Sequence, residues 1–188
     1  MSHHFSSMLD TAKSMIDNKS VKFVFVGGGP RKQEVVDYKN SHELDNIFIF
    51  GYQPMSRLIE SLSAADVHFI SLQDGFGGMV VPSKVFGVLS VGRPVIFQGN
   101  AESEIARMLK EHECGVQVDI DDKHRLQEHL LMYIADADLK RLHGGNAREA
   151  YLSQYSSKVG IDRYVELIAR LSNKSKTITR ATDLSPNK

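Results

Sequence analysis

Short runs in which every residue is apolar alternate with amphipathic segments along most of this chain. Two of the runs, at 23–26 and 47–50, read Phe-Val-Phe-Val and Ile-Phe-Ile-Phe. Such runs are typical of parallel strands, because helices cover both faces of a parallel sheet. The alternation therefore predicts an α/β fold, a parallel Rossmann-like sheet with helices on both faces.

The same patterns divide the chain into elements. Strands are expected at 21–26, 47–50, 67–71, 95–97 and 116–118. Helices are expected at 5–16, 31–40, 54–63, 83–91 and 102–111, followed by C-terminal helices between 121 and 171 with breaks near Asp136 and near Ser156 and Ser157. Residues 1–171 would then form one nucleotide-binding domain. Residues 172–188, rich in Ser, Thr, Lys and Asn, are expected to be a disordered tail.

Composition excludes some classes of function. Lys and Arg together number 23, as do Asp and Glu, so the formal charge of zero gives no basis for a nucleic-acid partner. No apolar run reaches the length of a membrane span, and no signal-peptide core stands at the N-terminus. Cys114, the one cysteine, is expected to be a buried thiol. These features together lead us to expect a cytoplasmic protein.

The loop after the third strand carries the densest chemistry. It runs Asp74-Gly75-Phe76-Gly77-Gly78 and ends at Pro82-Ser83-Lys84, where a helix begins. The glycines let the backbone approach a ligand, the helix start directs N–H groups at an anion, and Lys84 adds positive charge. A phosphate site and a flexible turn capped by Ser83 both fit this pattern. A P-loop does not, because no Gly-Lys-Ser/Thr sequence closes the loop.

Two further loops follow predicted strands. Residues 27–30 (Gly-Gly-Gly-Pro) form either a tight turn or a close approach of backbone to a ligand or partner domain. The dinucleotide fingerprint is excluded, because Lys32 stands where its last glycine would be. In the sequence Gly51-Tyr52-Gln53-Pro54, Gln53 can hydrogen-bond a base edge and Tyr52 can pack on a ring. Alternatively, Tyr52 covers the edge of the core.

Other candidate sites are weaker. The histidines do not show metal-ligand spacing, so no metal site is expected, and His124 and His129 are expected to be solvated. No Gly-x-Ser-x-Gly sequence indicates a serine hydrolase. The acidic cluster at positions 119, 121 and 122 is better explained by helix capping than by metal binding. Lys174, Lys176 and Arg180 either contact anionic lipid or lie in a solvated tail.

Several motifs occur in a recognisable order. They are Phe-Val-Phe-Val-Gly-Gly-Gly-Pro from position 23, Ile-Phe-Ile-Phe-Gly-Tyr from 47, Ala-Ala-Asp-Val from 64, Val-Pro-Ser-Lys from 81 and Val-Gly-Arg-Pro-Val-Ile from 91. Together they resemble the C-terminal, donor-binding domain of GT-B-fold glycosyltransferases of family 4. The closest likeness is to bacterial enzymes of capsule, O-antigen and colanic acid synthesis, and it extends from about residue 5 to about residue 171.

The resemblance implies a retaining hexosyltransferase that uses a nucleotide-diphosphate sugar without a cofactor or bound metal. The donor diphosphate would lie on Gly77, Gly78, Ser83 and Lys84, and the donor sugar would face the loop Asp74, Gly75, Phe76 and Gly77. The base would lie near Gly51, Tyr52, Gln53 and Pro54, with Gly28, Gly29 and His3 as further donor-facing positions. The acceptor would be a polysaccharide or a lipid-linked sugar, which places the protein at the inner face of the membrane as a peripheral contact.

The chain departs from the family pattern in three ways. Relatives hold the ribose with a glutamate eight residues after an acidic residue, and these positions are Gly87 and Met79 here. The N-terminal acceptor-binding domain has no counterpart, so the chain alone is expected to be inactive. The central first strand of the sheet is also expected to be absent. Its loss would bring the strands at 22 and 67 side by side, in the order 47, 22, 67, 95, 116, or leave a gap.

Two other functions remain open at this stage. One is a non-catalytic module that binds a nucleotide or a partner subunit. The other is a small Rossmann-like enzyme such as an epimerase or phosphatase, for which the sequence offers no evident acid–base pair.

Overall fold

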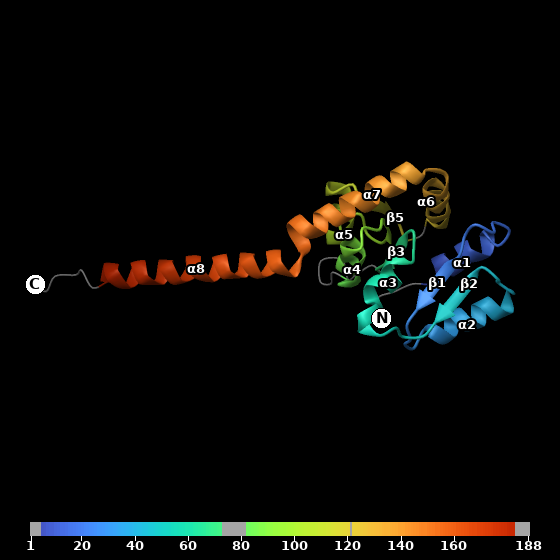
Figure 1. The fold of residues 1–188 in the computed structure, drawn as a ribbon, viewed down its shortest axis with the longest axis horizontal. Helices are drawn as coiled ribbons and strands as arrows, with labels where there is room; N and C mark the ends of the chain where they lie inside the picture. Colours follow the sequence, from blue (N-terminus) through green and yellow to red (C-terminus); the bar gives the residue numbers. More distant parts are fainter. Residues whose placement is uncertain (1–4, 73–81, 121, 183–188) are drawn as a thin grey trace, which may run out of the picture.

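The computed structural model describes residues 5–72, 82–120 and 122–182 (Figure 1). The elements in chain order are α1 Ser6–Ser14, β1 Phe23–Val26, α2 Lys32–Ser41, β2 Ile47–Phe50, the 3-10 turn η1 Met55–Arg57, α3 Leu58–Ser63, β3 His68–Ser71, α4 Lys84–Ser90, β4 Val95–Gln98, α5 Glu104–Glu111, β5 Gly115–Val118, α6 Lys123–Ala135, α7 Ala137–Ala150, the π-helical segment η2 Tyr151–Tyr155 and α8 Ser157–Thr182. Strands and helices alternate as far as α6, which confirms the α/β class.

The five strands of the described residues are parallel to their neighbours, but they form two sheets. β1 pairs with β2, and β4 lies between β3 and β5. The predicted neighbours are therefore confirmed within each sheet. Among the residues that the structure describes, β1 and β3 do not pair. The predicted pairing of the strands that begin at 22 and 67 is therefore not observed, and the order 47, 22, 67, 95, 116 divides between β1 and β3.

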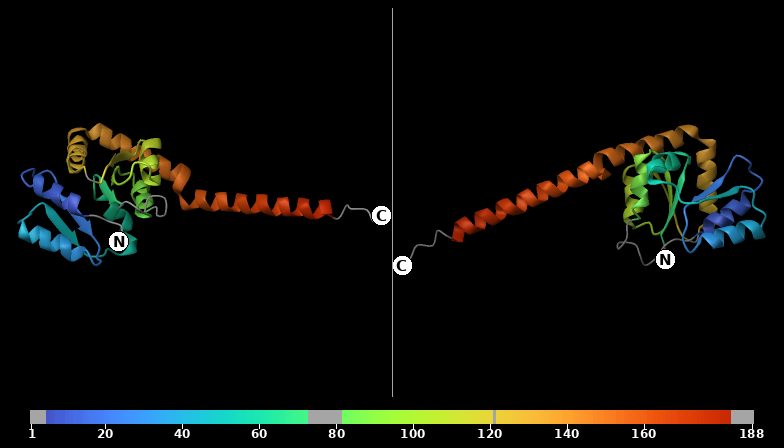
Figure 2. Two further views of the ribbon diagram at one scale, coloured as in Figure 1. Left: turned by 180° about the vertical axis from the view of Figure 1, so that it is seen from behind. Right: turned by 60° about the horizontal axis from the view of Figure 1, so that its bottom comes forward.

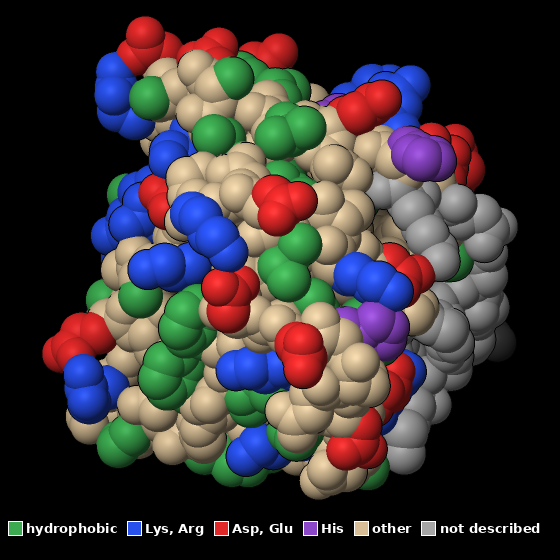
Figure 3. Space-filling model, turned by 90° about the vertical axis from the view of Figure 1, so that its right-hand side faces the viewer, with side chains coloured by type: hydrophobic (Ala, Val, Ile, Leu, Met, Phe, Trp, Pro, Cys, Tyr) green, Lys and Arg blue, Asp and Glu red, His purple; other side chains and the backbone are tan. Residues whose placement is uncertain are grey.

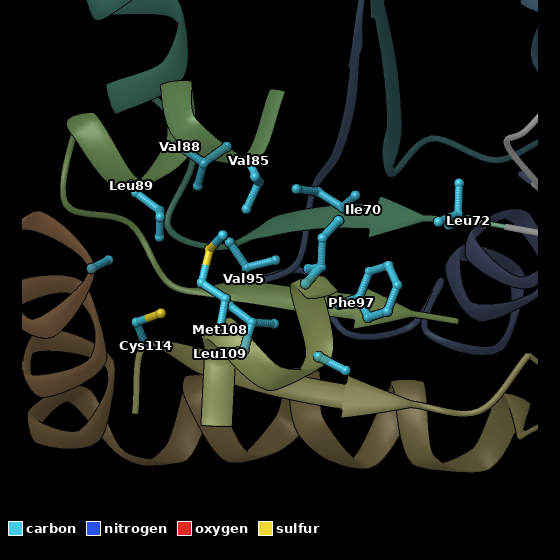
Figure 4. Close-up of a cluster of buried hydrophobic side chains, with 13 residues drawn as sticks. Ile70, Leu72, Val85, Val88, Leu89, Val95, Phe97, Met108, Leu109 and Cys114 are labelled. Carbon is cyan, nitrogen blue, oxygen red and sulfur yellow. The ribbon is translucent and has the colours of Figure 1, made fainter. Parts of the chain in front are cut away.

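The three-stranded sheet is covered on both faces. On one face, Ile70, Val95 and Phe97 pack against α4 and α5, as Figure 4 shows. On the other face, Ile96 and Val118 pack against α6. Every residue of β4 is buried, as expected for a central strand of a parallel sheet. Cys114 is buried in the first of these clusters, as predicted, and burial raises the pKa of its thiol to about 11.

The two-stranded sheet is covered on one face only. Phe23 and Ile47 pack against α1 and α2. The side chains that point the other way are exposed, namely Val24 (53%), Val26 (49%), Phe48 (37%) and Phe50 (50%). Within the described residues, helices therefore cover both faces of the three-stranded sheet and one face of this sheet. The helix that follows β2 does not cover it, because Leu62 of α3 packs against the core of the other sheet.

The C-terminal helices continue further than predicted. Breaks occur at Asp136 and Ser156, where the backbone is extended, as expected. α8, however, runs to Thr182, so residues 172–182 are helical rather than disordered. No glycine or proline lies between 172 and 182 to end the helix. α8 leaves the folded body after η2 and projects away from it, at the opposite end of the molecule from β1 and β2 (Figures 1 and 2). Within the described part of the chain, no helix is long and apolar enough to cross a membrane.

The side chains of His68 and Arg93 bind the carbonyl groups at the end of α3. His68 Nε2 lies 2.8 Å from the carbonyl oxygen of Leu62. Arg93 donates from Nη2 to the carbonyl oxygen of Ser63 at 2.6 Å. The pKa of His68 is lowered, mainly by burial and also by the positive charge of Arg93, although the Leu62 carbonyl acts in the opposite direction. The fold therefore favours the neutral imidazole.

Because the folded pKa of His68 lies below its unfolded value of about 6.5, this histidine should make the fold sensitive to acid. Its contribution is fully present above pH 6.5 and is lost as the pH falls through the lowered pKa. We expect the free energy of unfolding from urea titrations to decrease between pH 7 and pH 5, and to decrease less in His68→Gln, whose amide still donates to Leu62. Burial also lowers the pKa of His129 and His143, so the variant should reduce the effect only in part. An identical decrease in both proteins would contradict the assignment to His68.

Candidate functional site

The structure brings two of the predicted loops together. Val26 at the end of β1 is paired with Phe50 at the end of β2, and the Gly27 N–H donates to the Phe50 carbonyl at 3.1 Å. The loops that follow these strands lie at the carboxyl edge of a parallel sheet, where ligands of such sheets bind. Tyr52 joins the two loops, because a Cβ atom built on Gly28 would lie only 2.7 Å from its Cε2 atom. Glycine at position 28, which has no Cβ atom, therefore leaves the space that the Tyr52 ring occupies.

Tyr52 does not cover the core. It is 80% exposed, so the ring rests on the glycine turn while most of its surface faces solvent. An exposed aromatic ring held against a rigid turn is suited to stack on a planar ligand. The Gln53 side chain donates to the carbonyl oxygen of Gly51 at 3.2 Å, which keeps its amide within the same loop.

The glycine turn after β1 has a backbone reason for its composition. Gly27 and Gly29 both have φ of +120°, a conformation that other residues rarely adopt. The carbonyl of Gly29 accepts from Lys32 N at 3.1 Å where α2 begins. Residues 27–30 thus form a tight strand-to-helix turn. Arg31, which follows the turn, pairs with Glu34 at 2.8 Å.

The start of α4 contains the only predicted phosphate-binding residues that the structure describes. Ser83 and Lys84 are exposed, next to the buried Pro82. Ser83 makes no side-chain cap hydrogen bond, so the capping role is not observed. Among the described residues, no carboxylate pairs with Lys84. The other predicted donor-site residues, Asp74, Gly75, Phe76, Gly77, Gly78 and His3, lie outside the described residues, as does Met79.

Gln98, at the carboxyl edge of the three-stranded sheet, is a buried polar residue that was not among the predicted site residues. Gln98 is buried at the end of β4 and donates to the carbonyl oxygen of Ile120 at 3.0 Å. Its own carbonyl accepts from Leu72 N at 3.0 Å. Gln98 thus joins the segments that follow all three strands. The sequence signal that could have identified Gln98 is its position directly after the apolar run at 95–97.

The structure also explains why this chain has glycine at position 87, where the family pattern has the ribose-binding glutamate. Gly87 lies within α4, and a Cβ atom built on it would be 3.3 Å from Cδ1 of Leu62. Close packing of α3 against α4 therefore favours glycine at this position. The ribose contact stays unassigned.

Charged side chains of the described residues form no metal cluster and, on the face in Figure 3, no patch of one sign. No group of three metal-ligating side chains occurs within the described residues. Asp122 accepts from Arg125 N at 3.0 Å, which confirms its predicted capping role, but His129 is half-buried rather than solvated. On the face in Figure 3, Lys and Arg are interspersed with Asp and Glu. A surface pocket of about 260 Å³ near Glu111, His112 and Glu149 lies at the amino end of β5, away from the ligand-binding edge.

Comparison with known proteins identifies the family. The sequence of residues 4–150 matches the family described as glycosyl transferases group 1. The chain belongs to this family. It is also 25% identical over 166 residues to the protein named probable glycosyltransferase WbjE from Pseudomonas aeruginosa, covering 88% of this chain and 41% of that protein.

Solved structures show the same fold. The Anabaena protein HepE, crystallised with UDP, matches 88% of this chain and 44% of its own at a TM-score of 0.70 and 12% identity. The C-terminal domain of the group 1 glycosyltransferase LpcC from Francisella tularensis matches 80% of this chain and 78% of its own, at 0.61 and 20%. The fold is thus the Rossmann-like C-terminal half of a GT-B glycosyltransferase. The chain spans less than half the length of WbjE and HepE.

Proposed function

We propose that this chain binds the nucleotide-diphosphate sugar of a retaining family 4 glycosyltransferase of the capsule, O-antigen or colanic acid type. The transferred group is a hexose, and the acceptor is a polysaccharide or lipid-linked sugar. The observation that carries the proposal is the Tyr52 ring on the Gly28 turn, at the carboxyl edge of β1 and β2, in a chain of the group 1 family. HepE was crystallised with UDP, which supports a nucleotide ligand.

In this proposal, Tyr52 and Lys84 bind different parts of the donor. Tyr52 and the backbone of residues 51–54 bind the nucleoside, and Lys84 with Ser83 at the start of α4 binds the diphosphate. When the bond from the sugar to the diphosphate breaks, negative charge grows on the leaving oxygen, and a nearby ammonium group stabilises it. We propose that Lys84 supplies this charge without a metal ion. Gly77 and Gly78 would also contact the diphosphate, and the loop from Asp74 to Gly77 would face the sugar.

A further α/β domain, covalently linked or separate, would bind the acceptor. This part of the proposal is supported by length, since the chain spans 41% of WbjE and 44% of HepE. Without that domain, we expect donor binding but no sugar transfer. We further propose that the complete enzyme acts at the cytoplasmic face of the membrane, where lipid-linked acceptors are found.

Calorimetry with UDP, GDP and their hexose conjugates tests the donor site directly. Binding of one nucleotide series, with the other at least tenfold weaker, is the expected result. If none of these ligands binds to folded protein, the donor-site proposal is wrong. Binding of a nucleotide with no preference for its sugar conjugate, and no transfer when an acceptor domain is added, would instead indicate a non-catalytic module.

Tyr52→Ala tests the nucleoside half of the site. Loss of a ring that stacks on a base should weaken binding by about 1–2 kcal/mol, or roughly 5- to 30-fold. Uridine or guanosine alone should lose as much affinity as the diphosphate, because the phosphate contacts are unchanged. Tyr52→Phe should retain most of the affinity, since the ring remains. Equal binding by wild type and Tyr52→Ala would remove Tyr52 from the site.

A further inference from the structure

The two parts of the proposed donor site belong to different sheets. Tyr52 follows β2 of the two-stranded sheet, whereas Lys84 begins α4, which packs on the three-stranded sheet. Within the described residues, no strand pairing joins the two sheets. A nucleoside diphosphate can contact both residues at once only if another part of the fold fixes the distance between them.

Helix α3 connects these two residues. The loop that carries Tyr52 leads directly into η1 and α3, and at the start of η1 the carbonyl oxygen of Pro54 accepts from Arg57 N at 2.9 Å. The other end of α3 packs on the three-stranded sheet, because Leu62 joins the core cluster that contains α4. A Cβ atom built on Gly87 of α4 would lie 3.3 Å from Cδ1 of Leu62. This path from β2 through α3 to α4 can be followed in Figure 1.

Two side chains on the three-stranded sheet bind the carboxyl end of α3. His68, the first residue of β3, lies with Nε2 at 2.8 Å from the Leu62 carbonyl oxygen. Arg93, two residues before β4, donates from Nη2 to the Ser63 carbonyl oxygen at 2.6 Å. The last carbonyl groups of a helix carry partial negative charge, which a guanidinium group stabilises. Among the described residues, the buried Nε of Arg93 has no partner, so the bond to Ser63 is the contact that orients this side chain.

A second contact between the two sheets lies elsewhere and involves neither α3 nor the site loops. Leu130 of α6 packs against the core clusters of both sheets. Ser14 of α1 donates from Oγ to Oε1 of Gln127 in α6 at 3.0 Å. A single region of contact leaves two bodies free to rotate about it, whereas a second attachment fixes the angle between them. The carboxyl end of α3 provides that second attachment, on the helix that continues from the Tyr52 loop.

We infer that Arg93 is a positioning residue for the donor site. By binding the end of α3 to the three-stranded sheet, it sets the distance between Tyr52 and Lys84. The inference rests on the proposed function, in which these two residues bind the nucleoside and the diphosphate. Two contacts to one ligand reinforce each other only when their spacing matches the ligand, and the effective concentration of the second contact falls when the spacing varies. Without Arg93, the complete nucleotide should bind more weakly, while each part of it alone binds as before.

Three ligands distinguish this role from a direct contact. In Arg93→Met, UDP or GDP, whichever the wild type prefers, should bind at least about tenfold more weakly in calorimetry. The matching nucleoside and inorganic pyrophosphate, each titrated alone and followed by NMR, should bind as in the wild type, because each contacts one sheet only. Arg93→Lys retains a cationic donor and should recover part of the loss.

Arg148→Met provides the matched control. Arg148 of α7 also donates to the carbonyl group at the end of a helix, that of Ser90 in α4, but both of these helices pack on the three-stranded sheet. Its loss should leave the nucleotide affinity unchanged. Circular dichroism checks the folding of each variant. If Arg93→Met does not fold, Leu62→Ala loosens the same end of α3 and should give the same pattern of affinities.

A distance measurement tests the attachment without any nucleotide. Cys114, the one cysteine, is buried, so spin labels can be placed on Asn40→Cys in α2 and Lys110→Cys in α5, both at exposed positions. Double electron–electron resonance then reports the separation of the two sheets. Arg93→Met should broaden the distribution of distances, and Arg148→Met should not.

The outcomes separate this inference from the proposed function. Equal nucleotide affinity in wild type and Arg93→Met overturns the inference, as does a matching loss of affinity for the nucleoside or pyrophosphate alone. An unchanged distribution of distances in Arg93→Met also overturns it. A wild type that binds no nucleotide refutes the proposed function and with it the donor role of Arg93. A broadened distribution in Arg93→Met would still establish in that case that Arg93 fixes the two sheets.

Discussion

Replacing Lys84 by alanine should lower the affinity for UDP or GDP by about 10- to 150-fold, equivalent to roughly 1.5–3 kcal/mol. Lys84 is exposed at the first residue of α4, and no described carboxylate pairs with it. Its ammonium group is therefore available to a phosphate, and a hydrogen bond between two charged groups is stronger than one between neutral groups. Isothermal titration calorimetry of the variant and the wild type measures the difference.

The design includes two controls. Lys110→Ala removes an exposed lysine from the last turn of α5, at the other end of the strands, and should leave the affinity unchanged. Uridine or guanosine, which has no phosphate, should bind Lys84→Ala as well as the wild type. The same nucleoside should bind Tyr52→Ala more weakly. If Lys84→Ala binds the diphosphate with wild-type affinity, Lys84 has no role in phosphate binding.

The apolar runs and the glycines made most of the fold predictable. Apolar runs such as Ile47–Phe50 predicted the positions of the strands. Glycines such as Gly27 and Gly92 predicted where strands and helices end. These signals are local, so the sequence displays them directly. The division into two sheets was foreseen only as one of two outcomes, because it depends on which edges meet in space. The exposure of Val24 and Phe48 was not foreseen, since an apolar strand looks the same whether its second face is covered or open.

The candidate site was predictable as a set of loops but not as a geometry. Glycine-rich loops after parallel strands pointed to residues 27–30 and 51–54. That Tyr52 lies on Gly28 could not be read from the sequence, because the two residues come from different loops and meet only through the pairing of β1 with β2. Gln98 was missed for the same reason, since its partners at Leu72 and Ile120 are distant in sequence.

Two adjacent glycines of α7 should respond in opposite ways to alanine. Gly144 is buried where α7 crosses the turn at Gly92, and a Cβ atom built on it would lie 2.5 Å from the Gly92 carbonyl oxygen. That atom belongs to the backbone of a turn whose own φ is +67°, so it has little freedom to move. Gly144→Ala should force the helix and the turn apart and lower the free energy of unfolding by about 1–3 kcal/mol.

Gly145 provides the matched control, because it is exposed in the same helix and a Cβ atom on it meets nothing within 4 Å. Gly145→Ala should raise the free energy of unfolding by about 0.5–1 kcal/mol, since alanine restricts the unfolded chain and favours the helix. Urea unfolding at pH 7, followed by circular dichroism, gives both values if the slopes agree. A stabilised Gly144→Ala would show that α7 can move away from the Gly92 turn at little cost. The close contact would then not be what fixes α7 against the three-stranded sheet, and the packing of α4 and η2 on α7 would have to supply that restraint.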